Sequence, residues 1–261
     1  MPEPLEPVLG EELLRARDVL AQRRADGGGP SGAPPDGVVF CHQGGLVGAA
    51  ISRWRTRRLR GFSADIRLLR RTRGRVAVAT RFGVGAPAAV ALFEELLAFG
   101  VQRFVSIGIA GGLRGDAKVG DLIVAERALC DDGTSAQYLA TGGIVEASGP
   151  LTRRFADALE RVACPYTMGA LCSTDAPYRT TRAAVERWAA SGGMAVDMEA
   201  GGLLAAARHR RVDLAVACCV ADQLVRGGWR LSFDKAAVAS GVRSLFHAAV
   251  EALEPPDGSS R

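Results

Sequence analysis

The stretch Phe104-Val-Ser-Ile-Gly-Ile-Ala-Gly-Gly-Leu-Arg-Gly-Asp-Ala-Lys-Val-Gly-Asp-Leu-Ile-Val124 lies at the centre of the chain and decides its fold. It begins with an apolar run, Phe104 to Ile107, that has the length and β-branched content of a buried strand. Glycines then interrupt the run, and an apolar pattern resumes at Asp121-Leu-Ile-Val124. We therefore expect one strand that ends at the glycines and a second strand after the connection.

The glycines at positions 108, 111, 112 and 115 allow the backbone to approach a ligand. Glycine has no Cβ and adopts positive φ angles at little cost, so main-chain N–H groups can come close to a bound molecule. Ligands collect at the carboxyl ends of strands in parallel sheets. A glycine-rich hairpin or crossover without a ligand fits this stretch equally well, so the other motifs must decide.

Length and composition indicate one globular domain. Of 261 residues, 48% are apolar and 23% are charged, which is ordinary for a soluble protein. No run reaches the roughly 18 apolar residues of a membrane span, and the N-terminus lacks the basic flank and apolar core of a signal peptide. We therefore expect a cytoplasmic protein without membrane association.

The cysteines and histidines predict neither disulfides nor a metal site. The six cysteines are scattered, mostly inside apolar runs, and show no C-x-x-C spacing. They are typical of reduced core residues. The chain has only three histidines, and they do not cluster in the sequence.

Basic residues concentrate between Arg53 and Arg75, where ten arginines occur. Such a run can hold nucleic-acid phosphates. It has few interleaved aromatic residues and alternates with strand-like apolar positions, which favours a solvated strand face or a subunit interface. Nucleic acid is therefore not expected as a partner.

A segment rich in glycine and proline predicts where the compact domain begins. Residues 1–36 should form a short helix, Glu11 to Leu20, and a Gly/Pro-rich linker. The compact domain should cover residues 37–254, and residues 255–261 should be a disordered tail.

Strands and helices should alternate through the domain. Strands are expected at 37–41, 64–69, 75–80, 104–107, 121–125, 169–174 and 212–220, and helices at 46–53, 88–98, 150–163, 180–191, 200–208 and 233–253. The runs at 64–69 and 75–80 should pair as a hairpin. This alternation predicts a single α/β domain with a mixed, mostly parallel central sheet flanked by helices.

Two acidic residues stand where apolar elements stop. Glu199 begins a helix rich in small residues, so its carboxylate would be partly desolvated unless hydroxyl or N–H groups meet it, as a sugar diol would. A carboxylate favoured by the helix dipole is the alternative. Asp222 ends the strand 212–220 and could act as a general acid if burial raises its pKa. A helix cap or turn is the alternative.

Several motifs, taken in order, resemble the nucleoside phosphorylase family of the purine nucleoside and uridine phosphorylase type. That family also includes nucleosidases that cleave methylthioadenosine and adenosylhomocysteine. The motifs are Ser106-Ile-Gly-Ile-Ala-Gly-Gly-Leu113, Lys118-Val-Gly-Asp-Leu-Ile-Val124, Asp132-Gly-Thr-Ser135, Ser173-Thr-Asp-Ala-Pro-Tyr178, Val196-Asp-Met-Glu-Ala200 and Val220-Ala-Asp222. The resemblance covers roughly residues 37–253 and is greatest to bacterial uridine phosphorylase-like members.

This resemblance implies an enzyme that cleaves the N-glycosidic bond of a nucleoside, either a pentosyltransferase or an N-glycosyl hydrolase. Phosphate, or water in the nucleosidases, attacks C1′ through a transition state with positive charge on the ribose. Glu199 would bind the ribose hydroxyls and favour that charge, and Met198 would pack on the sugar unless it is a core residue. Asp222 would protonate a purine leaving group, and Tyr178 and Arg179 would lie near the base.

The phosphate-binding positions depart from the family pattern. The turn His42-Gln-Gly-Gly-Leu-Val47 lacks the Asp, Pro and Arg of the family's G-D-P-x-R-like turn. Ser106 stands where phosphorylases usually have an arginine, and Ile109 stands where they have a threonine. Each lost charge-assisted bond is worth roughly 1.5–3 kcal/mol. Phosphate binding is therefore either altered or absent.

Other residues are candidates for an altered phosphate site. Gly44 lies at a strand-to-helix junction, which can admit an anion, and Gly83 keeps the family's backbone loop. Arg60 resembles the arginine that a neighbouring subunit lends to the site, and Arg81 is a further candidate cation. Family members assemble as dimers, trimers or hexamers in which a neighbour completes the site, so the resemblance implies a homo-oligomer with a shared site.

The leading hypothesis is a nucleoside phosphorylase that uses phosphate as co-substrate and needs no other cofactor. A nucleosidase that uses water is the first alternative, and Ile109 favours it. A catalytically degraded binding protein is the second. The base is open, because Asp222 favours a purine and the uridine phosphorylase-like similarity favours a pyrimidine.

Overall fold

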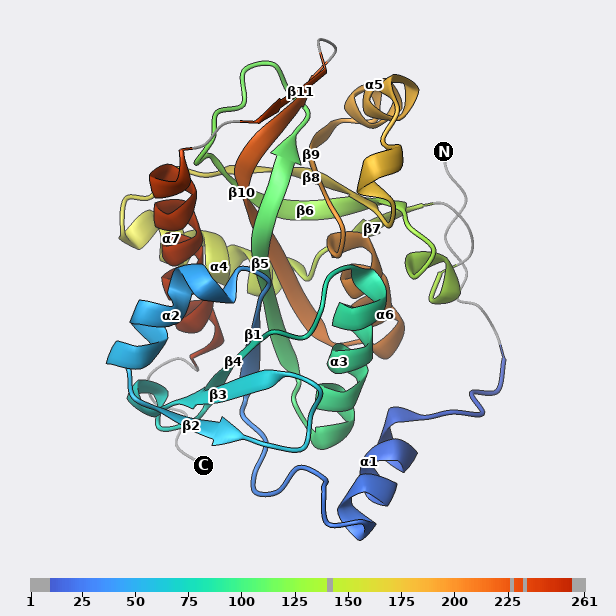
Figure 1. Cartoon of the computed structure of the whole chain (residues 1–261), viewed down its shortest axis with the longest axis vertical. Helices are drawn as coiled ribbons and strands as arrows, with labels where there is room; N and C mark the ends of the chain where they lie inside the picture. Colours follow the sequence, from blue (N-terminus) through green and yellow to red (C-terminus); the bar gives the residue numbers. More distant parts are fainter. Residues whose placement is uncertain (1–9, 140–142, 226–227, 232–233, 255–261) are drawn as a thin grey trace.

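The protein is described by a computed structural model that covers residues 10–139, 143–225, 228–231 and 234–254. Helices surround a twisted sheet (Figure 1). The helices are α1 (Ala16–Ala25), α2 (Gly44–Arg53), α3 (Ala86–Phe99), α4 (Gly149–Arg161), α5 (Arg182–Ala190), α6 (Ala200–Arg210) and α7 (Lys235–Leu253), with short 3-10 turns η1 (Arg70–Thr72), η2 (Ser135–Gln137) and η3 (Pro177–Arg179). The predicted tail, residues 255–261, lies outside the described residues, as does Phe233, the predicted start of the last helix.

The sheet is mixed, and part of it closes into a barrel. The strands are β1 (Gly37–Cys41), β2 (Thr56–Leu59), β3 (Asp65–Leu69), β4 (Val76–Thr80), β5 (Arg103–Gly112), β6 (Leu122–Asp131), β7 (Ile144–Glu146), β8 (Thr167–Thr174), β9 (Gly193–Asp197), β10 (Asp213–Val225) and β11 (Gly228–Leu231). Pairing runs in a ring from β10 through β6, β8, β9 and β5 back to β10. A closed ring leaves no free strand edge within it.

Parallel pairing holds the centre of the sheet. The strands β4, β1, β5 and β10 are parallel neighbours, while β3 and β2 continue from β4 in antiparallel pairing. The predicted hairpin of β3 and β4 is confirmed. The predicted α/β fold with a mixed central sheet and flanking helices is therefore confirmed.

The central strand is longer than the glycine pattern predicts. β5 continues through Gly108 to Gly112 instead of ending at Ile107, because β10 and β9 pair with it there. A Cβ at Gly111 would lie 2.8 Å from Asp222 Oδ1 and 2.8 Å from Leu224 Cδ1. The glycines therefore admit a neighbouring strand and its side chains, and they do not break the element.

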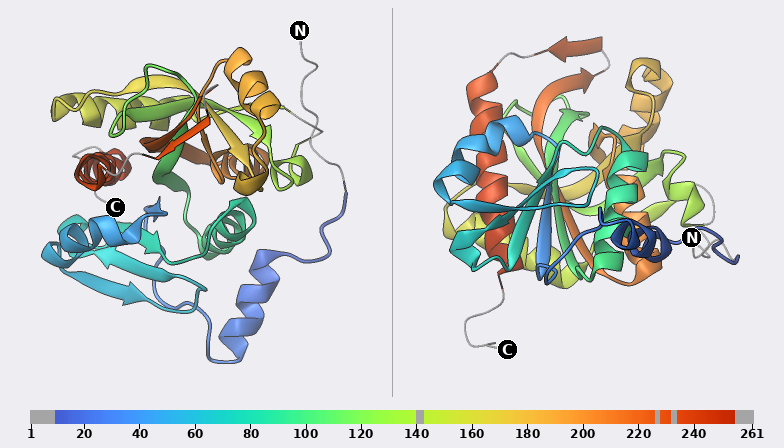
Figure 2. Two further views of the ribbon diagram at one scale, coloured as in Figure 1. Left: turned by 45° about the horizontal axis from the view of Figure 1, so that its top comes forward. Right: turned by 60° about the horizontal axis from the view of Figure 1, so that its bottom comes forward.

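The two faces of the sheet carry separate apolar cores. Side chains alternate along a strand, so Phe104 packs in one core and Val105 in the other. The first core lies beneath α3 and α6, which pack against each other, and the second lies beneath α4 and α7 (Figure 2). Phe93 and Phe246, both fully buried, represent these two layers.

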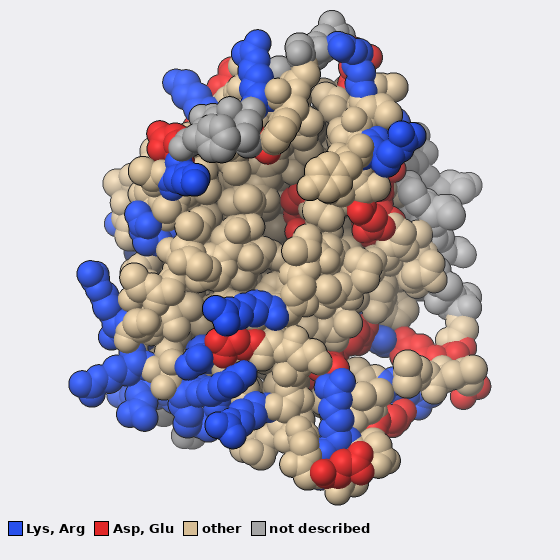
Figure 3. Space-filling model, in the orientation of Figure 1, with Lys and Arg blue, Asp and Glu red and all other residues tan. Residues whose placement is uncertain are grey.

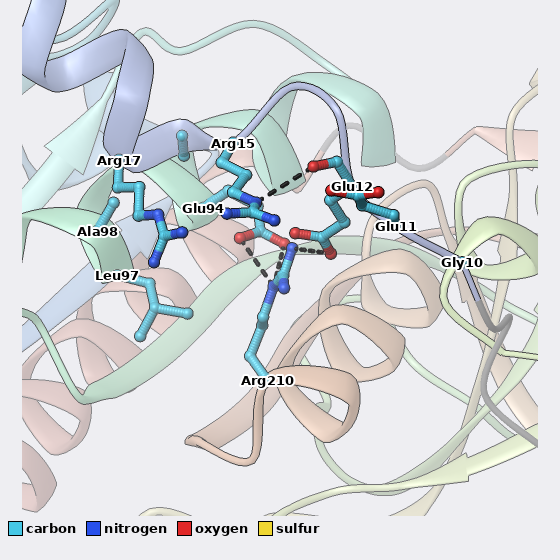
Figure 4. A pocket seen from close by; sticks show the side chains of 10 residues that line it. Gly10, Glu11, Glu12, Arg15, Arg17, Glu94, Leu97, Ala98 and Arg210 are labelled. Atoms are coloured by element: carbon cyan, nitrogen blue, oxygen red, sulfur yellow. Dashed lines mark hydrogen bonds and ion pairs between the residues drawn. The ribbon is translucent and has the colours of Figure 1, made fainter.

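The N-terminal helix is displaced from its predicted position. It spans Ala16–Ala25 instead of Glu11–Leu20 and packs on α3, with Leu20 buried and Arg23 paired to Glu95 at 2.9 Å. The segment before it is held by polar contacts, because Arg210 of α6 pairs with Glu12 at 2.7 Å and with Glu94 at 2.8 Å (Figure 4). We call Glu12, Glu94 and Arg210 the N-terminal clasp.

The arginine run lies at one edge of the sheet. It covers the end of α2, the edge strand β2, β3 and η1, and basic side chains gather on this part of the surface (Figure 3). Strand β2 was not predicted, because its Arg57 and Arg58 are exposed and hide the strand pattern. In the part of the chain that the structure describes, no helix is long and apolar enough to cross a membrane.

Candidate active site

A cavity of about 530 Å³ opens where the carboxyl ends of the parallel strands meet the N-terminus of α6. This volume is typical of small-molecule sites. The cavity is lined by backbone or side chains of His42, Gln43, Gly83, Val84, Ser106, Gly108, Ile109, Ala110, Gly111, Thr174, Pro177, Tyr178, Thr180, Val196, Asp197, Met198, Glu199, Val216, Cys218, Ala221, Asp222, Leu224 and Trp229. The position agrees with the general rule for ligand sites in α/β sheets.

Glu199 stands at the N-terminus of α6 with its side chain only 13% exposed. Its Oε1 accepts a hydrogen bond of 2.7 Å from the backbone N–H of Gly85. Gly85 has φ +90°, a conformation that favours glycine and that aims this N–H at the carboxylate. The contact fixes one carboxylate oxygen and leaves the other to meet a ligand in the cavity.

Asp197 lies behind Glu199 and is almost fully buried. Its Oδ1 accepts a hydrogen bond of 2.6 Å from the Ser173 hydroxyl, and its Oδ2 accepts one of 2.9 Å from the Ala200 N–H. Burial, together with the nearby charge of Glu199, raises the pKa of Asp197 to about 7. Asp197 therefore tends to carry a proton near neutral pH, which lessens its repulsion of Glu199.

His42 follows β1 and reaches into the same cavity. Its Nε2 lies 3.0 Å from Ser106 Oγ, and its Nδ1 lies 3.8 Å from Glu199 Oε1. The ring packs edge-on against Phe82, with centroids 5.0 Å apart. Burial lowers the pKa of His42, and the Glu199 carboxylate opposes this shift. The imidazole is therefore neutral at pH 7.

Asp222 lines the cavity from β10, the strand that flanks β5 on the side away from β1. The sequence predicted that this strand ends at Asp222, and this prediction is wrong. Strand β10 continues to Val225 after a register shift between Val220 and Asp222. The hairpin with β11, which was not predicted, carries Trp229 back across the strand. Trp229 Nε1 donates a hydrogen bond of 3.0 Å to Asp222 Oδ2, which leaves Oδ1 without this donor.

The structure brings most of the predicted site residues together. Seven of them line the cavity, namely Gly83, Ser106, Ile109, Tyr178, Met198, Glu199 and Asp222. Gly44, Arg60 and Arg179 are outside the lining: Gly44 begins α2, Arg60 follows β2 and is exposed, and Arg179 ends η3. That Arg60 contributes to the phosphate site of a neighbouring subunit stays a prediction.

Three lining residues that act on Glu199 or Asp222 were missed from the sequence. His42 was quoted only for what its turn lacks, and Asp197 stood unassigned inside the Val196-Asp-Met-Glu-Ala200 motif. Trp229 gave no signal, because its role depends on the hairpin with β10. A titratable residue directly after the first parallel strand is the one signal that would have found His42.

The cavity is rich in carboxylates and poor in cations. Among the described residues that line it, none is lysine or arginine, while Asp197, Glu199 and Asp222 are acidic. The described part of the chain also holds no cluster of His, Cys, Asp and Glu suited to a metal ion. An arrangement of this kind favours a ligand with hydroxyl groups and with positive charge that develops during reaction.

The fold and the site define an α/β protein with an acidic small-molecule cavity, and the family follows from comparison. Residues 54–254 match the family described as the phosphorylase superfamily. The chain belongs to this superfamily. Because the match begins after β1, His42 and its turn lie outside the matched residues.

Curated relatives are nucleoside phosphorylases. The chain is 31% identical to a guanosine phosphorylase of Halorubrum lacusprofundi over 145 residues, which are 56% of this chain and 60% of the relative. It is 33% identical to a uridine phosphorylase of Thermococcus kodakarensis over 99 residues, 38% of this chain and 36% of the relative. The matches thus span less than two thirds of the length of these relatives.

Solved structures share the fold over most of the chain. A purine nucleoside phosphorylase of Toxoplasma gondii matches with a TM-score of 0.72 at 16% identity, over 85% of this chain and 91% of that one. An AMP nucleosidase of Bacteroides thetaiotaomicron matches with a TM-score of 0.71 at 15% identity, over 92% and 96%. At these identities, the likeness supports the fold alone.

Proposed function

We propose that the protein cleaves the N-glycosidic bond of a nucleoside, with phosphate as the attacking group, and releases free base and pentose 1-phosphate. The observation that carries the proposal is the pair Glu199 and Asp222, which line one cavity. The curated relatives named as guanosine and uridine phosphorylases support it.

Glu199 serves the sugar in this proposal. Its free oxygen accepts hydrogen bonds from the ribose hydroxyls, and its negative charge stabilises positive charge that develops on the ring. Met198 packs against the sugar. Asp222 gives a proton to a purine leaving group through Oδ1. Tyr178 and Trp229 line the cavity and are largely exposed, so their rings are free to pack against the base at the cavity rim.

Hydrolysis is the second candidate, and one observation favours it. A phosphate anion next to Glu199 would meet no cation from the described lining residues, and Ser106 and Ile109 offer one hydroxyl and one apolar side chain. Phosphorolysis therefore requires a cation from elsewhere, and Arg60 of a neighbouring subunit in a homo-oligomer is our candidate. Hydrolysis requires none, because water is neutral.

The test is a panel of purine and pyrimidine nucleosides, incubated with and without inorganic phosphate. Free base is followed, and the sugar product is identified as pentose 1-phosphate or pentose. We expect base release that depends on phosphate. Equal rates without phosphate, with pentose as product, would assign the protein to the hydrolases, and no base release from any nucleoside would refute both forms of the proposal.

A further inference from the structure

Three polar groups that line the cavity, His42, Ser106 and Glu199, form a row. Ser106 Oγ and His42 Nε2 are 3.0 Å apart, and His42 Nδ1 and Glu199 Oε1 are 3.8 Å apart. All three residues line the cavity. They come from β5, from the turn after β1 and from the start of α6, so the row exists only in the folded chain.

The tautomer of His42 decides which group donates in the hydrogen bond between His42 and Ser106. At neutral pH the imidazole carries one N–H, because burial lowers the His42 pKa. If Nε2 accepts the Ser106 hydroxyl proton, the N–H lies on Nδ1 and faces Glu199. Nδ1 is buried and has no hydrogen-bond partner in this state. A protonated imidazole would place positive charge beside the Glu199 carboxylate, so the row is built to accept one proton.

We propose that His42, acting through Ser106, accepts the proton of the group that attacks C1′. This inference rests on the proposed function. The attacking group is water or monobasic phosphate, both of which carry an O–H. The new C1′–O bond forms as the C1′–N bond breaks, and the electron pair of that bond leaves with the base, which takes a proton from Asp222 or solvent. The proton of the attacking group passes to Ser106 Oγ, the Ser106 proton passes to His42 Nε2, and Glu199 stabilises the imidazolium.

The surroundings of His42 support this role. Phe82 packs edge-on against the ring, and a Cβ placed on Gly108 would lie 3.5 Å from His42 Cδ2. The His42 side chain is only 10% exposed, so water reaches the ring poorly. Among the described residues, Glu199 is the charged group that acts on His42. Asp197, at the end of β9, interacts with Glu199. Burial raises the pKa of Cys41, the residue before His42, to about 12, so this thiol stays neutral.

The kinetic test compares His42→Gln and Ser106→Ala with the wild type, and uses His247→Gln as control. His247 is an exposed histidine whose ring packs edge-on against Trp54, and partial desolvation there also lowers its pKa. Loss of a proton acceptor costs about 10²-fold in rate. We expect His42→Gln to lower kcat by this factor with little change in KM and to remove the acidic limb of the pH profile. His247→Gln should leave both unchanged.

A second measurement, an NMR titration of His42, tests the interaction of His42 with Glu199 independently of activity. The His42 imidazole signal is assigned by NMR from its loss in His42→Gln and titrated in the wild type and in Glu199→Gln. We expect a pKa below the ordinary 6.5 in the wild type, and a further fall in Glu199→Gln, because the carboxylate raises it. An unchanged value would show that Glu199 does not stabilise the imidazolium.

The outcomes separate this inference from the proposed function. A wild type that releases base, with His42→Gln equally fast and with the same pH profile, refutes the role of His42 and leaves the proposed function intact. A wild type that releases no base refutes both. If His42→Gln fails to fold, Ser106→Ala decides, because the proposal requires it to slow the reaction as well.

Discussion

Two groups of carboxylates in this molecule have opposite electrical surroundings. In the N-terminal clasp, Glu12 and Glu94 are both bonded to Arg210. In the cavity, Asp197 and Glu199 lie close together, and none of the described lining residues is lysine or arginine. A paired carboxylate stabilises the fold, whereas an uncompensated carboxylate is costly unless a ligand or a reaction uses its charge. The comparison therefore sets a structural cluster against the cluster that we propose to be functional.

The largest effect expected from this difference is on activity in Glu199→Gln. The amide still accepts the Gly85 N–H, so the fold keeps this bond. Under the proposed function this change removes the negative charge that stabilises the transition state, so kcat/KM should fall about 10²–10³-fold. Thermal stability should stay equal or rise, since repulsion of Asp197 is relieved. Base release and thermal unfolding measure the two quantities.

Glu94→Gln is the matched control for that experiment. It makes the same chemical change in a carboxylate that is paired with Arg210. Activity should stay within about twofold, and stability should fall. If Glu199→Gln instead lost stability and kept its activity, Glu199 would be a helix cap, and the contrast between the two clusters would disappear.

The next largest effect is on stability in Arg210→Ala. This change leaves Glu12 and Glu94 without their shared partner, while alanine suits the helix. The pair with Glu94 is mostly buried and the pair with Glu12 is more exposed, so the free energy of unfolding should fall by about 1–2 kcal/mol. Denaturant unfolding measures this value.

Arg208→Ala controls for the loss of a basic side chain on the same helix. Arg208 is exposed, and its removal should cost less than about 0.5 kcal/mol. Nucleoside cleavage should be unchanged in both arginine variants, because neither residue lines the cavity. A loss of activity in Arg210→Ala alone would mean that the clasp and the cavity are coupled.

The clasp and the cavity also differ in how far the sequence predicts them. Glu199 and Asp222 stand where apolar runs of the sequence stop, and local patterns mark such positions. The clasp joins Glu12 to Glu94 and Arg210, which lie far apart in the chain, and no local pattern marks that contact. For this reason the helix of α1 was predicted too early in the sequence.

The same limit explains the errors within the sheet. The glycines of β5 were taken for its end, because a local pattern does not show that β9 and β10 pair there. Strand β11 and Trp229 depend on a hairpin whose apolar pattern is short. His42 was not predicted, because the role of a single histidine depends on its contacts in the fold. Its hydrogen-bond partner Ser106 comes 64 residues later in the chain.

The smallest effect concerns the pH dependence of stability, and its sign should differ between the two clusters. The folded pKa of Asp197 is raised to about 7 from the ordinary 3.8. Between these values the folded protein holds a proton that the unfolded chain has released, so the contribution of Asp197 to stability falls as pH rises from about 4 to about 7.

The pKa of Glu12 is lowered by Arg210, so its contribution is present above about pH 4.5 and is lost as pH falls. Thermal unfolding from pH 4 to 8 of the wild type, Asp197→Asn and Glu12→Gln measures both contributions as differences in Tm. The wild type should lose its advantage over Asp197→Asn with rising pH and gain its advantage over Glu12→Gln, whereas two differences of the same sign would show that the cavity carboxylates are compensated as those of the clasp are.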